Sequence, residues 1–241
     1  MIKKRSINKI ACVGEVMIEL VMDGPADANI GVAGDTYNTA VYLSRLLRGQ
    51  NKSVSYVTAL GLDRFSARIF DHMKRHNVDA SYVERRPDLM PGLYAIDTDD
   101  AGERSFTYWR SQAAARSLFA KPCQIKLNAL NDFDLIYVSG ITMAVLPPDT
   151  RTALIEFLTT YRENGGYVVY DSNYRPRLWE DLETAQTITM DLWRLADIAL
   201  PSLGDEMDLF QEENEAQVTE RLHEAGVTFG ALKRGSNGPL S

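Results

Sequence analysis

Residues suited to chemistry gather in short polar clusters along this chain of 241 residues, and the first is the stretch GVAGDTYN at residues 31–38. Glycines let the backbone approach a ligand closely, while the carboxylate of Asp35 and the amide of Asn38 could bond to hydroxyl groups at the start of a helix. Such groups, aimed from a rigid turn, are suited to binding a sugar. The structural alternative is that the glycines only make a turn and that Asp35 or Thr36 caps the helix.

A second cluster belongs to an expected β-hairpin with strands at residues 92–97 and 104–110. Side-chain alternation places Tyr94 on one face of the first strand, and Tyr108 and Arg110 together on one face of the second. Aromatic rings could cover a small ligand, and a guanidinium can bind a carboxylate through two hydrogen bonds. We therefore expect a lid over the ligand. The alternative is a hairpin whose aromatic side chains pack on the domain or on a second subunit.

A third cluster, DSNYRPR at residues 171–177, follows an expected strand. Ligands of parallel sheets bind at the carboxyl ends of the strands, so an acid, an amide and two arginines there indicate a binding site. Glu15 and Glu19 lie on an expected strand, where ordinary solvated positions are the favoured interpretation. His72 and His76 have a spacing that could bind a metal ion, but a third ligand is lacking nearby in the sequence.

Strands and helices must alternate to position these clusters. Apolar runs predict strands at residues 10–14, 54–60, 134–140, 167–171, 198–200 and 229–233, and helical patterns lie between them. This order predicts an α/β fold with a mostly parallel central sheet flanked by helices. We expect one domain over residues 1–241, with lid strands at about 15–22 and 90–110. A partner strand should begin where the chain stops at Ser241, so we expect the C-terminal part of the domain to be missing.

The composition excludes several classes of function. A net charge of −7 argues against nucleic-acid and membrane-surface binding, which need a concentrated basic face. Two cysteines, Cys12 and Cys123, are typical of a cytoplasmic protein without disulfides. The first apolar run, residues 10–13, is too short for a signal peptide or a membrane span.

These segments together resemble the ribokinase-like (PfkB) sugar kinases, and among them the branch that acts on the sugar acid 2-keto-3-deoxygluconate. The matching segments are Gly14 and Glu15 with Glu19, then residues 31–38, 58–61 with Asp63, 91–94, 102–110, 139–141, 171–179 and 233–235. The runs GERSFTYWR and DSNYRPRLW are specific to that branch, whereas the glycine-rich stretch is shared by many sugar kinases.

The resemblance implies transfer of a phosphoryl group from ATP, with Mg²⁺, to the terminal hydroxyl of the sugar acid. The substrate-binding residues expected from the clusters and the resemblance are Gly34, Asp35, Asn38, Tyr94, Tyr108, Arg110 and Arg175. The residues expected near the nucleotide are Asn173, Ser202, Lys233 and Gly235, with Glu206 as the metal ligand. The partners implied are the sugar acid, ATP and a second subunit that pairs through the lid.

Two departures from the family pattern stand out. Leu203 takes the place of the asparagine in an Asn-x-x-Glu motif. The Gly-Ala-Gly-Asp motif that supplies the catalytic base is absent from the chain, so we expect no catalytic residue within it. Two alternatives remain open: another sugar kinase of the same fold, acting on fructose or ribose, or a sugar-acid-binding module without phosphotransfer.

Overall fold

The computed structural model describes residues 5–24, 27–99 and 101–241, which form two compact units. One unit contains residues up to Ala11 together with Leu127–Ser241, and the other contains Cys12–Lys126. Strand β1 (Lys9–Val13) runs through the boundary between them. Among the described residues, none of the helices combines the length and the apolar character needed to cross a membrane.

In the unit of residues 12–126, the end of β1 neighbours β4 (Ser53–Leu60), which pairs in parallel with the short β5 (Val83–Arg85). β4 is buried along nearly its whole length, as expected for a strand covered on both faces. The helices of this unit are α1 (Asp35–Leu46), α2 (Arg64–Arg75) and the 3₁₀ turn η1 (Ala114–Ser117). Asp63 begins α2 by accepting hydrogen bonds from the backbone N–H groups of Phe65 and Ser66, at 2.8 and 3.0 Å.

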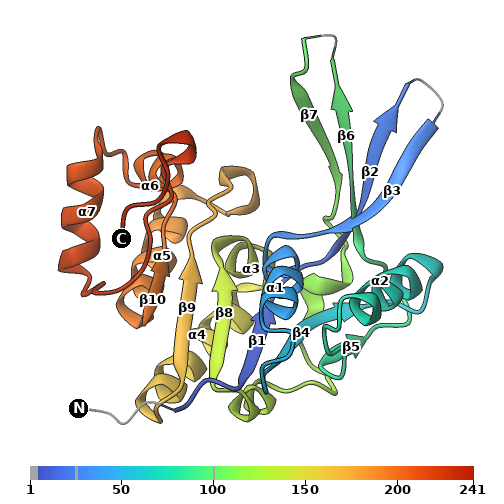
Figure 1. Ribbon diagram of the computed structural model, residues 1–241, viewed down its shortest axis with the longest axis horizontal. Coiled ribbons are helices and arrows are strands. Elements are labelled where there is room, and N and C mark those ends of the chain that lie inside the picture. The colour runs from blue at the N-terminus through green and yellow to red at the C-terminus, as the bar shows by residue number, and fades with distance from the viewer. Residues whose placement is uncertain (1–4, 25–26, 100) are drawn as a thin grey trace. The chain divides into compact units, whose positions relative to one another are not determined.

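The same unit carries a small sheet in the order β3-β2-β6-β7. Its strands are β2 (Met17–Asp23), β3 (Asp27–Ala33), β6 (Gly92–Thr98) and β7 (Arg104–Trp109). Two antiparallel arms, β2 with β3 and β6 with β7, are joined by parallel pairing of β2 with β6. The arms separate toward their tips (Figure 1). Strands β2, β6 and β7 lie in or next to the stretches near residues 15–22 and 90–110 where lid strands are expected, and their role as a lid stays a prediction.

Strand β3 corrects the interpretation of the glycine-rich stretch. Gly31 was expected in a turn, but it lies within β3, opposite Glu19 of β2. The chain leaves the strand only at Ala33, and Gly34 then occupies the N-cap position of α1. A strand therefore feeds this helix.

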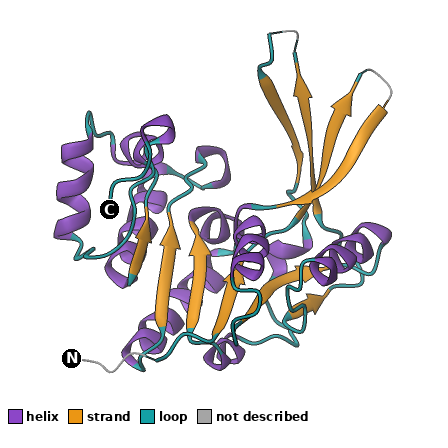
Figure 2. Ribbon diagram, viewed as in Figure 1, coloured by secondary structure: helices purple, strands orange, loops and turns teal. Residues whose placement is uncertain are grey.

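In the other unit, β1 is followed across the sheet by β8 (Leu135–Ser139), β9 (Tyr167–Asp171) and β10 (Ile198–Leu200). β8, β9 and β10 are parallel, and Ser139, Asp171 and Leu200 are in register at their carboxyl ends. The α-helices are α3 (Gly140–Val145), α4 (Pro148–Glu163), α5 (Leu182–Leu195), α6 (Leu203–Phe210) and α7 (Glu215–Glu224). The 3₁₀ turns are η2 (Leu127–Asp132), η3 (Pro176–Leu178) and η4 (Gly235–Asn237). Figure 2 shows these helices around the strands.

The segment at residues 229–233 differs from the expected strand. It makes only isolated parallel bridges to the β10 region, at Ala199 with Gly230 and at Ser202 with Lys233. Gly230 runs so close to Ala199 that a Cβ atom would overlap the Ala199 carbonyl oxygen. The two segments therefore contact each other through their backbones, without a regular ladder of hydrogen bonds. An antiparallel bridge between Leu232 and Leu240 follows it.

Candidate functional site

A polar row crosses one face of the small sheet. Gly31, Glu19, Tyr94 and Tyr108 are in register on neighbouring strands, so the side chains of Glu19, Tyr94 and Tyr108 point to the same side. Gly31 makes room for its neighbour, because a Cβ atom there would lie 2.8 Å from Oε1 of Glu19. The hydroxyl of Tyr94 donates a hydrogen bond to Oε2 of Glu19. The row offers a carboxylate and phenol groups to a polyhydroxy ligand.

Aromatic rings continue this row toward the edge strand β7. The rings of Tyr94 and Tyr108 stack with centroids 5.7 Å apart, and those of Phe106 and Tyr108 stack at 6.3 Å. Tyr94 is buried, whereas Tyr108 is about half exposed, at 49%. Burial, together with the carboxylate of Glu19, raises the pKa of Tyr94, so its hydroxyl remains a hydrogen-bond donor near neutral pH.

Glu15 is not the solvated strand residue that the alternation predicted. It precedes β2, its side chain is 1% exposed, and Oε2 accepts a hydrogen bond from Nη2 of Arg110. Burial raises the pKa of Glu15, and the guanidinium of Arg110 opposes that effect. Arg110, expected to be available to a ligand, is therefore already paired within the protein. Glu19 is only partly buried, but it too has a partner, in Tyr94.

The start of α1 lies beside this pair. Gly34 passes so close to the backbone of Glu15 that a Cβ atom would overlap the Glu15 carbonyl oxygen. Asp35 is near enough to raise the pKa of Glu15 further, while Asn38 is exposed on the helix. The capping alternative is wrong, because the N-cap is Gly34 and the hydroxyl of Thr36 bonds instead to Tyr56, at 2.9 Å.

In the other unit, polar groups gather where β9 and β10 end. The ammonium group of Lys233 lies 2.7 and 2.8 Å from the two carboxylate oxygens of Asp171. The backbone N–H of Ser202 donates to the hydroxyl of Ser172, at 3.1 Å. Asn173 follows with φ = 30°, a left-handed angle that is costly for a residue with a side chain and is common at binding sites. Gly235 begins η4 two residues after Lys233.

Asp205 is a functional candidate that the sequence analysis missed. Oδ2 accepts a hydrogen bond from the backbone N–H of Tyr174, at 3.2 Å, and Oδ1 lies 3.4 Å from Nη1 of Arg175. Burial raises its pKa, whereas Arg175 and Lys233 lower it, which places Asp205 in the same electrostatic cluster. Counting the Asn-x-x-Glu spacing from Ser202 leads to Asp205, so a signal was present.

Glu206, expected to bind a metal ion, points into a different environment. Its side chain is 0% exposed, and Oε2 accepts hydrogen bonds from Arg221 at 2.9 Å and from the indole N–H of Trp193 at 3.3 Å. Arg221 also binds Glu212, at 2.7 and 2.9 Å, and stacks on Phe210. Metal binding by Glu206 stays a prediction, and it would require the carboxylate to leave these partners. The described residues contain no group of three or more acidic, histidine or cysteine side chains placed to bind a metal ion.

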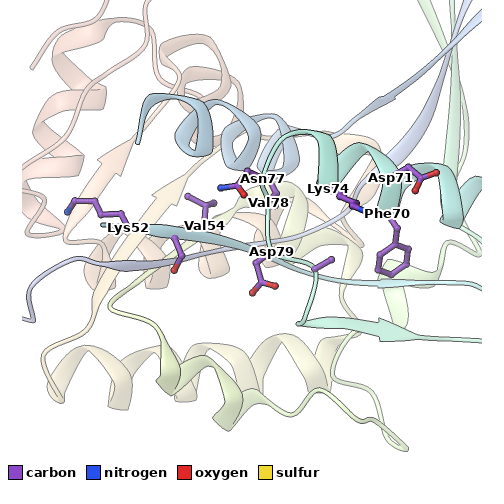
Figure 3. Close-up of a pocket in the computed structure, with 10 residues that line it drawn as sticks. Lys52, Val54, Phe70, Asp71, Lys74, Asn77, Val78 and Asp79 are labelled. Atoms are coloured by element: carbon purple, nitrogen blue, oxygen red, sulfur yellow. The ribbon is translucent and has the colours of Figure 1, made fainter. Parts of the chain in front are cut away.

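Two other features of residues 12–126 lie outside these clusters. A hydrogen bond of 2.7 Å joins the hydroxyl of Tyr37 to Nδ1 of His72, and the ring of His72 contacts that of His76. A cavity of about 550 Å³ is lined by residues such as Lys52, Phe70 and Asp79 (Figure 3). None of the expected site residues lines this cavity.

Comparison with known proteins identifies the family to which this chain belongs. The chain matches the pfkB family carbohydrate kinases over residues 7–240. It is 43% identical over 233 residues to a 2-dehydro-3-deoxygluconokinase of Escherichia coli (strain K12), covering 96% of this chain and 75% of that protein.

Solved structures share the fold. A PfkB protein from Polaromonas sp. JS666 superposes with a TM-score of 0.83 at 24% identity, covering 97% of this chain and 78% of that one. A fructokinase from Xylella fastidiosa with bound ATP gives a TM-score of 0.79 at 22% identity, covering 95% of this chain and 69% of that one. The parallel sheet, the second small sheet and the matching family together show that this chain belongs to the pfkB family of carbohydrate kinases.

Proposed function

We propose that this protein phosphorylates 2-keto-3-deoxygluconate with ATP, giving 2-keto-3-deoxy-6-phosphogluconate. The observation that carries the proposal is 43% identity, over 96% of the chain, to a protein named 2-dehydro-3-deoxygluconokinase. The two runs that resemble this branch of the family, residues 102–110 and 171–179, coincide with the small sheet and with the polar cluster after β9. Sequence similarity and site chemistry thus support the same substrate.

The small sheet supplies the groups that a sugar acid needs. Glu19 and the hydroxyl of Tyr94 would bond to sugar hydroxyls, while the ring of Tyr108 would cover the carbon chain. Arg110 would bind the carboxylate through its planar guanidinium. Gly34, Asp35 and Asn38 would complete this site from the start of α1. A neutral sugar would leave Arg110 without an anionic ligand.

The cluster at the ends of β9 and β10 would bind the nucleotide phosphates. Lys233 provides a cation, and Ser202 occupies the N-cap position of α6, where the positive end of the helix dipole favours anions. Asn173, Arg175 and Gly235 would line the same site. Transfer would then proceed by attack of the terminal sugar hydroxyl on the γ-phosphoryl group, with catalysis mainly by positioning and charge neutralisation. We assign the role of catalytic base to no residue of this chain.

The metal requirement of such a transfer fits the same cluster. Carboxylate oxygens are the ligands that Mg²⁺ prefers, and Asp171 and Asp205 both present them near Lys233. Bound Mg²⁺ would neutralise charge on the phosphates. On this assignment Glu206 would not bind the metal ion and would stay paired with Arg221 in the protein interior.

We also propose a homo-oligomer that assembles through the small sheet. Trp109 and Ile30 are 58% and 42% exposed, and strand alternation places them on the face opposite the Glu19–Tyr94 row. Pairing with a second copy would cover these apolar side chains. Sedimentation at rising protein concentration should show a dimer that Trp109→Glu weakens, and a monomer at every concentration would contradict the assembly.

The function is tested by measuring ATP-dependent phosphorylation of 2-keto-3-deoxygluconate beside ribose and fructose, with binding of each sugar measured by calorimetry. We expect this chain to bind the sugar acid alone, and we expect turnover of the sugar acid in a form of the protein that carries the Gly-Ala-Gly-Asp motif. Arg110→Ala should abolish sugar-acid binding, whereas Arg104→Ala, at the end of β7 that is distant from Arg110 in the sequence, should not. Phosphorylation of neutral sugars would indicate another member of the family. Sugar-acid binding without turnover, in the form that carries the Gly-Ala-Gly-Asp motif as well, would indicate a binding module.

A further inference from the structure

The ion pair between Glu15 and Arg110 is buried but incomplete. The side chains are 1% and 11% exposed, and a single contact joins Oε2 of Glu15 to Nη2 of Arg110. Within the part of the chain that the structure describes, Oε1 of Glu15 and Nε of Arg110 have no hydrogen-bond partner. Buried polar atoms are nearly always paired, so two such atoms in one ion pair mark a place where a further group is accommodated.

The surroundings of Glu15 explain why its Oε1 atom has no hydrogen-bond partner among the described residues. Gly92 lies against it, and a Cβ atom there would be 2.6 Å from Oε1. The charged and titratable groups that face Glu15 come from three other elements: Asp35 of α1, Tyr56 of β4 and Arg116 of η1. Asp35 disfavours the ionised form of Glu15 and Arg116 favours it, but neither makes a hydrogen bond to Glu15. Among the residues that the structure describes, Arg110 is therefore the direct counterion of Glu15.

A buried carboxylate depends strongly on its direct counterion. Removing one partner of a buried ion pair leaves a charge whose desolvation is no longer compensated. A buried carboxyl group avoids that cost by taking up a proton. Any ligand that draws Arg110 away from Glu15 should therefore drive proton uptake by Glu15.

We infer that, before the sugar acid binds, Glu15 holds Arg110 as an internal substitute for the carboxylate of the sugar acid, and that the bound sugar acid displaces Glu15, which then takes up one proton. The inference rests on the proposed function, since it requires a sugar acid to bind Arg110. The charges balance, because the ligand brings one negative charge and the proton from solvent one positive charge. A neutral sugar offers no anion to exchange for Glu15, so this pair selects for acids.

Calorimetric titration with 2-keto-3-deoxygluconate, in buffers of different ionisation enthalpy between pH 6 and 8, tests the exchange. We expect the wild-type protein to take up about half to one proton per sugar acid bound, and its Kd to rise by up to about tenfold per pH unit. Glu15→Gln should bind the sugar acid with no proton uptake and with little dependence on pH. The matched control is Glu84→Gln, another buried glutamate beside an arginine in the same unit, with Oε1 4.0 Å from Arg86. It should keep the proton uptake of the wild type.

The possible failures are distinguishable. If the wild-type protein binds the sugar acid without proton uptake, or if Glu15→Gln retains the uptake, the inference is wrong while the proposed function stands. If the wild-type protein binds no sugar acid, both are wrong. The wild-type titration decides the matter even if Glu15→Gln does not fold.

Discussion

Replacing Arg221 by methionine would test how the protein keeps the carboxylate of Glu206 in its interior. Glu206 is fully buried, and its direct partners are Arg221, at 2.9 Å, and the indole N–H of Trp193, at 3.3 Å. Methionine retains much of the aliphatic volume of arginine but neither its charge nor its hydrogen bonds. We expect the free energy of unfolding to fall by about 3–5 kcal/mol at neutral pH, the range measured when one partner of a buried pair is removed.

The loss should depend on pH in a defined direction. Burial raises the pKa of Glu206 in the folded protein, and Arg221 limits the rise. Without Arg221 the folded pKa should move further above the unfolded value of about 4.3. The unfolded state then releases the proton first as pH rises, so the folded state loses relative stability between the unfolded and the folded pKa. The deficit of Arg221→Met should therefore be largest near pH 8 and should shrink toward pH 4.3.

Urea unfolding followed by tryptophan fluorescence from pH 4.5 to 8 measures this deficit, since Trp193 is buried beside Glu206. Glu212→Gln is the matched control, because it removes the more exposed partner of Arg221 and leaves Glu206 paired; it should cost less than about 1 kcal/mol. Adding Glu206→Gln to Arg221→Met should recover much of the loss. A deficit below about 1 kcal/mol at pH 8, or one that is constant with pH, would refute the reasoning.

Two further predictions concern residues 12–126 and the start of α6. Gly34→Ala should lower the free energy of unfolding by about 1–3 kcal/mol, because its Cβ atom would overlap the backbone of Glu15. Gly204→Ala, whose Cβ atom would meet nothing within 4 Å, should be neutral or stabilise α6 by up to about 1 kcal/mol; equal shifts in melting temperature would contradict this contrast. Burial lowers the pKa of His72 to about 4, so its contribution to stability should be full above pH 6.5 and decline as pH falls toward 4. An NMR titration midpoint for His72 above 6 would show this to be wrong.

Periodicity in the sequence was enough to predict the parallel sheet. β4, β8 and β9 are apolar runs between helical patterns, and their burial confirms the prediction. β3 could not be found in this way, because its sequence DANIGVA includes residues of low strand propensity and three small residues, glycine or alanine. Pairing with β2 stabilises it instead. The segment at residues 229–233 failed in the opposite sense, since its apolar pattern is present but its backbone makes only isolated bridges to the β10 region.

The candidate site was predictable where it depends on local alternation. Tyr94 and Tyr108 do share one face of the small sheet, as the spacing predicted. The partner of Arg110 was not predictable, because Glu15 is 95 residues away in the sequence and only the folded sheet brings them together. Burial of Glu206 depends in the same way on Arg221 of a later helix. Residue types and their spacing can indicate a site, but the ion pairs within it depend on the tertiary structure.

The parallel pairing of β2 with β6 also sets the order in which the small sheet can assemble. Each arm joins strands that are close in the sequence, whereas the seam between the arms joins Glu19 to Tyr94, 75 residues apart. Closing a loop of about 70 residues costs roughly 2.5 kcal/mol more entropy than closing one of about four. Each arm can therefore form as a local hairpin, whereas we expect the seam to become favourable only after the α1-β4-α2-β5 segment between the arms has folded and shortened that loop. The Glu19–Tyr94 hydrogen bond, which lies on the seam, is thus a late event in folding.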